Sequence, residues 1–146
     1  MGKLIDGKSI AKAIHEQTAA RVALLKKQGV TPQLAVILVG DDQPSRTYVR
    51  KKGEAAERVG ITFALREMPA STSTDEVLKT LADLQRDASL SGLIVQLPLP
   101  DHINTQAVLN GIKPELDVDC LTDVNLGKLV MKTYSIVPPT PGAVMS

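Results

Sequence analysis

The sequence predicts a three-layer α/β domain in which a mostly parallel sheet is flanked by helices. Residues 33–39 (QLAVILV) and 92–96 (GLIVQ) are each apolar on both faces, as strands are when helices cover both sides of a parallel sheet. Segments with helical periodicity alternate with strand-like segments, which is the order of repeated strand–helix–strand units. We therefore expect 33–39 and 92–96 to lie at the centre of the sheet.

The first part of the chain supplies two helices and the first central strand. A helix should run from about Ser9 to Gln28, with Ser9 as its N-cap and Gly29 as its end. Strand 33–39 follows, and a second helix over 44–59 comes after that strand. In a parallel sheet such a helix begins at the carboxyl end of the strand before it.

The middle and end of the chain show weaker patterns. Residues 61–69 alternate in polarity, which predicts a strand nearer an edge. Ser73 and Glu76 can form a capping box for a helix from about 73 to 87. After strand 92–96 we expect, in chain order, a short helix near 105–111, an Asp-rich loop and a strand near 134–137.

The composition excludes several classes of protein. The 146 residues are 43% hydrophobic and 23% charged with a formal net charge of +1, and interleaved acids and bases leave no basic stripe for nucleic acid or membrane. The first residues lack the apolar run of a secretory signal, and Asp6 stands where a myristoylation signal needs Ser or Thr. The single cysteine, Cys120, cannot form an internal disulfide. We expect a cytoplasmic protein without a membrane-spanning segment.

Helix 44–59 contains one residue that breaks its pattern. At about 100° per residue one face is apolar and the other is charged, and Lys52 falls in the middle of the apolar face, one turn after Tyr48. A lysine there often packs its stem and extends its ammonium to water, and a tyrosine there is more often core than binding site. The alternative is that both serve a ligand. The other members of the face are Ser45, Val49, Ala55, Ala56 and Val59.

The expected topology brings a third polar residue to the same place. Strand 92–96 ends in Gln96, and the prolines of the following LPLP prevent further pairing. Tyr48 and Lys52 lie in a helix that begins at the carboxyl edge of the sheet, so they should face the crevice that Gln96 enters. Ligands of open parallel sheets bind at this edge. We therefore expect a small-molecule site there.

Four motifs occur in order along the chain: LIDGKSIA (4–11), VGDDQPSRTYVRKK (39–52) followed by GI, LIVQLPLP (93–100) and DVD (117–119). Together they resemble the bifunctional methylenetetrahydrofolate dehydrogenase and methenyltetrahydrofolate cyclohydrolase family. The resemblance implies the folate-binding catalytic domain at 1–137, with 138–146 starting the connection to a Rossmann domain that binds the nicotinamide cofactor. No G-x-G-x-x-G occurs, so we expect no site for that cofactor in this chain.

The resemblance also implies roles for particular residues. Lys52 would be the catalytic lysine, with Tyr48 and Gln96 as its neighbours in the folate site. Asp119 would hold the pterin of a tetrahydrofolate substrate. NADP would be bound by the missing domain, and the parent protein would be a homodimer. The walls of the pocket would be Pro98, Leu99 and the PPTP segment at 138–141, although loop prolines that end strands explain these residues equally well.

These residue types suit the two reactions. In hydride transfer to the nicotinamide, the protein orients two rings. Hydrolysis of the methenyl carbon needs a positioned acid–base group, and burial together with a cationic substrate would disfavour the charged form of Lys52. Gln96 can orient the amine without an opposite charge that would hold it as ammonium. Asp119 can accept two hydrogen bonds from a pterin edge, although an aspartate in such a loop is ordinarily a turn residue.

The chain departs from the family pattern in two places. Where members usually read KDVDG, Leu116 precedes the DVD and Cys120 follows it. If the glycine position has a positive φ, Cys120 would strain the turn that aims Asp119. In the family's PCTP-x-G motif, Pro139 replaces the cysteine and Ala143 replaces the glycine.

Two other interpretations remain open from the sequence. A flavodoxin-like signalling receiver would use Asp41 and Asp42 as a magnesium-binding pair, but Gln96 stands where its phosphoacceptor aspartate belongs. A catalytically silent module would bind folate without turning it over. We expect no metal site, and we expect His15 and His102 to be surface residues because neither lies near a second candidate ligand.

Overall fold

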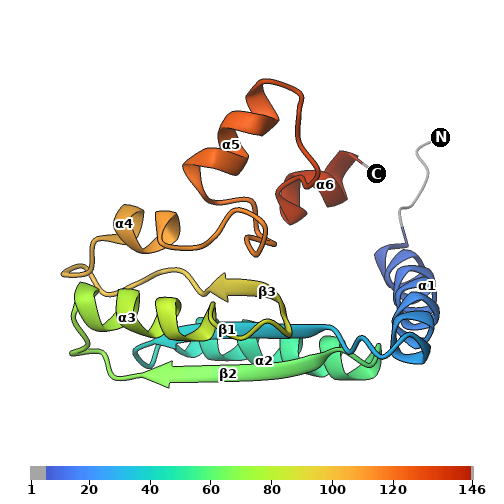
Figure 1. The fold of residues 1–146 in the computed structure, drawn as a ribbon, viewed down its shortest axis with the longest axis horizontal. Helices are drawn as coiled ribbons and strands as arrows, with labels where there is room; N and C mark the ends of the chain where they lie inside the picture. The colour runs from blue at the N-terminus through green and yellow to red at the C-terminus, as the bar shows by residue number, and fades with distance from the viewer. Residues whose placement is uncertain (1–5, 146) are drawn as a thin grey trace.

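The structure of the protein is a computed structural model that describes residues 6–145 (Figure 1). The beginning of the LIDGKSIA motif lies outside this range, as do the other residues before Asp6. The described chain is an α/β fold with a parallel sheet flanked by helices, as the sequence predicts.

The sheet has three parallel strands in the order β2–β1–β3, formed by β1 (Gln33–Val39), β2 (Thr62–Met68) and β3 (Leu90–Val95). The strand over 33–39 is central as predicted, and β2 is at an edge as predicted. The prediction that the strand at 92–96 is also central is wrong, because β3 is the other edge of this sheet. A strand that is apolar on both faces is one whose two faces are covered by other layers of the fold. Such a strand can lie at the edge of the sheet, with a neighbouring strand on one side only.

The outer edge of β3 is nevertheless covered. The Leu93 amide donates a 2.8 Å hydrogen bond to the carbonyl oxygen of Leu116, and Leu93 forms a single parallel bridge with Asp117. Most of β3 is buried, Ser91 being its exposed residue. Residues 116–117 thus occupy the place of a fourth strand for one bridge only, and this contact positions the DVD motif.

Residues 6–145 form six helices. They are α1 (Gly7–Lys27), α2 (Gln43–Arg58), α3 (Thr74–Leu84), α4 (Thr105–Asn110), α5 (Asp123–Val130) and α6 (Pro139–Met145). The capping box of Ser73 and Glu76 is confirmed at the start of α3. The N-cap predicted for α1 is wrong: Asp6 accepts hydrogen bonds from the backbone N–H groups of Lys8 and Ser9, so the helix begins earlier. Gly29, with φ +82°, follows the end of α1 as predicted.

The predicted strand near 134–137 does not form, and α5 occupies part of the region expected to be loop. The edge of β3 that such a strand could join is taken by residues 116–117. A strand cannot satisfy its backbone without a partner, so this segment stays irregular. Helix α5 begins where Thr122 caps it by accepting a hydrogen bond from the Asn125 amide.

Helices pack on both faces of the sheet through apolar clusters, so the fold has three layers: helix, sheet and helix (Figure 1). Helix α2 covers one face through a small cluster of Val36, Leu38, Val49 and Ile94. Helices α3 and α4 cover the other face through a larger cluster that includes Ile37, Val77, Leu81, Leu93 and Val108. Helix α1 lies at the end of the sheet opposite the strand arrowheads (Figure 1), and Val22 is its one buried residue. None of the described helices is long and apolar enough to cross a membrane.

Candidate functional site

Helix α2 carries Lys52 toward the carboxyl edge of the sheet. Asp42 caps the helix by accepting a 2.9 Å hydrogen bond from the Ser45 amide, which starts α2 directly after the loop that leaves β1. Gln96 follows β3. Its backbone N–H donates a 2.9 Å hydrogen bond to the Ile37 carbonyl oxygen, so its backbone is held by the central strand. The two side chains therefore approach each other from a helix and from a strand end, as the topology predicts.

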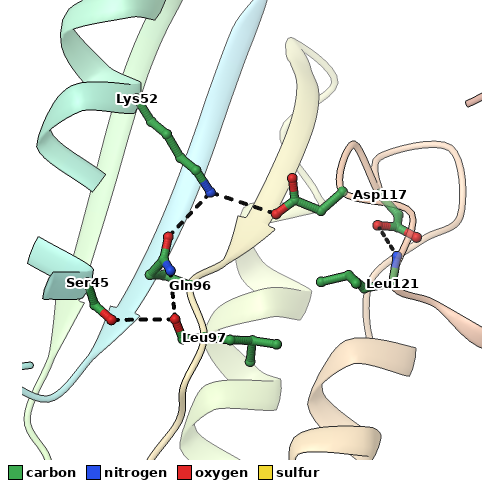
Figure 2. A network of polar contacts seen from close by, with 7 residues as sticks. Ser45, Lys52, Gln96, Leu97, Asp117 and Leu121 are labelled. Atoms are coloured by element: carbon green, nitrogen blue, oxygen red, sulfur yellow. Dashed lines mark hydrogen bonds and ion pairs between the residues drawn. The ribbon is translucent and has the colours of Figure 1, made fainter. Parts of the chain in front are cut away.

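The amine of Lys52 lies between an amide oxygen and a carboxylate (Figure 2). Its Nζ donates a 3.3 Å hydrogen bond to Gln96 Oε1 and is 3.8 Å from Asp119 Oδ2. The second distance is an ion pair without a direct hydrogen bond. The structure thus brings together three of the predicted site residues, which are separated by 44 and 23 positions in the sequence.

The orientation of the Gln96 amide is set by its own neighbours. Gln96 Nε2 donates a 2.7 Å hydrogen bond to the Leu97 carbonyl oxygen, which leaves Oε1 directed at Lys52 (Figure 2). The same carbonyl accepts a longer bond of 3.4 Å from Ser45 Oγ. Ser45 is buried on α2, so this contact also links the helix to the segment after β3.

Tyr48 and Lys52 lie beside the buried stripe of α2, not in its middle as the helical pattern predicts. Tyr48 is 60% exposed and the Lys52 side chain is 35% exposed. The buried stripe runs through Ser45, Val49, Gly53 and Ala56. Gly53 packs so closely on the Phe63 ring that an added Cβ would lie 2.9 Å from a ring carbon. Gly53 has no side chain and was not counted as apolar in the helical pattern. The predicted apolar face was therefore centred on Lys52, one position before the residue that is buried.

This correction changes the environment expected for the amine. The full burial that the sequence argument relied on is absent, and a carboxylate lies near the amine in addition to the neutral amide of Gln96. Ion pairs with this much exposure contribute about 0–1 kcal/mol, so the pairing of Lys52 with Asp119 matters for geometry more than for stability.

Asp119 projects from a tight turn, and the residue after it, Cys120, has a positive φ. Cys120 has φ +57° and is fully buried. Cys120 occupies the position of the glycine in the family's KDVDG motif. This position has a positive φ, which a residue with a Cβ adopts under strain. Burial raises the pKa of the Cys120 thiol, and the charge of Asp117 raises it further. The thiol stays protonated and acts as a small apolar side chain.

Asp117, the first aspartate of DVD, is a buried polar residue that the sequence reading did not single out. Its carboxylate accepts hydrogen bonds from the Leu121 amide, from both the amide and hydroxyl of Thr122, and from Asn125 Nδ2. Burial by itself raises the pKa of Asp117, but these hydrogen bonds outweigh it and hold the pKa below its usual range. The sequence signal available here was the N-cap position of Thr122, three residues before Asn125; the contacts of Asp117 with both residues follow no local pattern.

The remaining predicted residues lie at the margin of this cluster or away from it. Leu99 is buried in the larger core cluster, and Pro98 is exposed. Both line a depression of about 180 Å³ beside Asp41 and Asp42, and Lys52 is not part of its lining. His102 is exposed and its Nε2 lies 2.8 Å from the Thr72 carbonyl oxygen. Within residues 6–145 no group of three or more His, Cys, Asp or Glu side chains could hold a metal ion.

The fold and the cluster define a class of protein. A lysine, an amide and a carboxylate gathered near the carboxyl edge of a parallel α/β sheet are typical of domains with a small-molecule site. Residues 5–119 match the family model described as tetrahydrofolate dehydrogenase/cyclohydrolase, catalytic domain. The chain belongs to this family. That membership sets aside the signalling receiver, and Asp42, offered there as a magnesium ligand, instead caps α2.

Several relatives cover nearly all of this chain. The bifunctional protein FolD of Listeria innocua is 44% identical over 145 residues, which are 99% of this chain and 51% of the relative. The crystal structure of FolD from Campylobacter jejuni is 38% identical with a TM-score of 0.95, covering 98% of this chain and 51% of that one. The Trypanosoma brucei enzyme, solved with NADP and an inhibitor, is 39% identical with a TM-score of 0.93, covering 99% and 50%. The chain thus spans about half the length of these proteins.

Proposed function

We propose that this chain carries the folate site and catalytic lysine of a bifunctional methylenetetrahydrofolate dehydrogenase and methenyltetrahydrofolate cyclohydrolase. The parent would oxidise methylenetetrahydrofolate and hydrolyse the methenyl product to formyltetrahydrofolate, in one-carbon metabolism. The observation that carries the proposal is the convergence of Lys52 with Gln96 and Asp119 near the carboxyl edge of the sheet. Family membership and relatives named for both activities support it.

Lys52 is assigned the acid–base role in hydrolysis. Water adds to the cationic methenyl carbon, and one carbon–nitrogen bond then breaks, so a proton must leave the attacking water and another must reach the departing nitrogen. The Lys52 amine, held by Gln96 Oε1 at 3.3 Å, can move such a proton when it is neutral.

Asp119 is assigned to the pterin. At 3.8 Å from Lys52 its carboxylate makes no direct hydrogen bond to the amine, so its oxygens can accept bonds from the amino group and ring N–H of a pterin edge. Once those donors engage Asp119, the carboxylate is shared with the substrate and Lys52 keeps the neutral Gln96 amide as its partner. Tyr48, with a largely exposed ring on the same side of α2, is assigned as a flat contact for the bound ligand.

The partners follow from the same assignment. The nicotinamide cofactor NADP supplies the hydride acceptor, and we assign no described residue of this chain to hold it. Residues 1–137 would form the folate-binding domain and 138–146 the start of the connection to a cofactor domain. Pro98, Leu99 and the 138–141 segment would border the pocket. The parent would be a cytoplasmic homodimer.

The test replaces the amine and keeps its stem. In the full-length parent, Lys52→Met should lower cyclohydrolase turnover about 10²–10⁴-fold, the usual loss when a general acid–base is removed. Hydride transfer takes no proton from Lys52, so part of the dehydrogenase activity should persist. Lys51→Met is the matched control, since Lys51 is the exposed neighbour on α2. The rate of hydrolysis is measured from the decrease in absorbance of the methenyl substrate.

Two outcomes would contradict the assignment in different ways. A folded Lys52→Met enzyme with full cyclohydrolase activity would end the catalytic role of Lys52. A parent that binds 5-formyltetrahydrofolate and turns over neither substrate would instead be the catalytically silent module. Equal losses in the Lys51 and Lys52 variants would point to a general effect of removing positive charge from α2.

A further inference from the structure

A buried polar cluster lies behind the loop that carries Asp119. Asp117, Thr122 and Asn125 are 3%, 1% and 4% exposed. Asp117 Oδ2 accepts bonds of 2.9 Å from the Thr122 amide, 2.8 Å from the Thr122 hydroxyl and 3.0 Å from Asn125 Nδ2. Its Oδ1 accepts a 3.1 Å bond from the Leu121 amide (Figure 2). One carboxylate therefore accepts hydrogen bonds from four donors within the following eight residues.

This cluster closes a turn that is anchored on both sides. Before the turn, Asp117 forms the parallel bridge with Leu93 of β3. After it, Thr122 caps α5, and Asn125 ties that helix back through a 2.8 Å bond to the Pro114 carbonyl oxygen. The turn between these anchors has only four residues to place, so its course is tightly restricted.

The side chains within the turn alternate between two environments. Val118 packs on the α2 side of the sheet, and its Cγ1 would lie 2.7 Å from a Cβ added to Gly92 of β3. Asp119 follows and faces Lys52, while Cys120 is buried with a positive φ. Packing holds Val118 and Cys120 within the turn, and the hydrogen bonds to Asp117 close it, so both sets of contacts restrict the direction of Asp119.

We propose that Asp117 is a positioning residue, which holds the 117–122 turn in the course that brings the Asp119 carboxylate to Lys52. Its relevance to catalysis rests on the proposed function, but the geometric claim does not. Four donors converge on it, and an ionised carboxylate has acceptor sites for all of them. An asparagine has one acceptor oxygen and an NH₂ group that would meet other donors, so it cannot replace the aspartate.

The first experiment reads the turn without any ligand. The chain is labelled with ¹³C-lysine and the Lys52 side-chain resonance is assigned. Its chemical shift is compared between the unmodified chain and the Asp119→Asn variant, which lacks the negative charge near the amine. Asp117→Asn should move the Lys52 resonance in the same direction as Asp119→Asn. The double variant should show little further movement, because the second change acts through the first. The Leu121 and Thr122 amides should also lose protection from hydrogen exchange in Asp117→Asn.

A matched control separates positioning from a general loss of stability. Asp87 accepts hydrogen bonds of 2.8 and 2.6 Å from the amide and hydroxyl of Ser89, in a turn away from Lys52. Asp87→Asn should leave the Lys52 resonance unchanged. If Asp117→Asn does not fold, Asn125→Ala removes one of the four donors and should give a smaller shift in the same direction. An unmoved Lys52 resonance in the folded variants, or additive shifts in the double variant, overturns the inference.

A second experiment connects the turn to ligand binding. Titration with 5-formyltetrahydrofolate should show weaker binding for Asp117→Asn than for the unmodified chain, by at least tenfold, and no additional loss when Asp119→Asn is already present. If the unmodified chain does not bind this probe while the Lys52 shifts occur as expected, the proposed function fails and the positioning role stands. If the probe binds and Asp117→Asn binds it equally well, the positioning role fails and the proposed function stands.

Discussion

Replacing Cys120 by glycine and by alanine measures the strain in the turn before α5. Cys120 has φ +57°, a conformation in which a Cβ costs about 1–2 kcal/mol and a glycine does not pay this penalty. Both replacements remove the buried sulfur, so their difference isolates the Cβ. Glycine loses about 0.8 kcal/mol for one buried methyl and about 0.4–1 kcal/mol of backbone entropy relative to alanine. The strain relief offsets these losses, and the two variants should agree within about 1 kcal/mol.

Ala56→Gly provides the comparison at a buried position of ordinary geometry. Ala56 is 6% exposed and lies within α2. Glycine there loses about 1 kcal/mol of helix propensity and about 0.8 kcal/mol for the buried methyl, so we expect a loss of about 2 kcal/mol. Urea unfolding followed by circular dichroism measures all of these variants. If Cys120→Gly is less stable than Cys120→Ala by the same 2 kcal/mol, approximately, then the turn is not strained at this position and the argument is refuted.

Three further predictions follow from other parts of the structure. Gly92→Ala should lower the free energy of unfolding by about 1–3 kcal/mol, because the new Cβ would lie 2.7 Å from Val118 Cγ1; a variant of unchanged stability in urea would show that Val118 moves freely. The folded-state pKa of Asp117 is depressed, so its stabilising contribution is present above its unfolded pKa of about 4 and is lost as the pH falls through the lower folded value. The stability difference between the unmodified chain and Asp117→Asn should therefore shrink from neutral pH to about pH 3, and a difference that grows would contradict this sign. Finally, calorimetry should detect no micromolar NADP binding to this chain, since it contains no G-x-G-x-x-G, and measurable binding would mean that the domain division is wrong.

The local elements were predictable because their causes are local. The central strand at 33–39 and the capping box of Ser73 and Glu76 follow from runs and spacings within a few residues. The meeting of Lys52 with Gln96 was also predictable, since a parallel sheet brings the carboxyl ends of its strands to one edge. The edge position of β3 was not, because an apolar run reports covering layers and says nothing about strand order.

Only the tertiary structure decided the environment of the site. Packing of Gly53 against Phe63 sets the rotation of α2, and that rotation leaves Tyr48 and Lys52 beside the buried stripe. The approach of Asp119 to Lys52 depends on the bridge to β3, which joins residues distant in sequence. The sequence by itself determined that Lys52 and Gln96 reach this edge of the sheet, because helical periodicity and the order of strands and helices are carried by the chain. Their distances and exposure were decided by side-chain packing between elements, which depends on volumes and contacts that no local pattern contains.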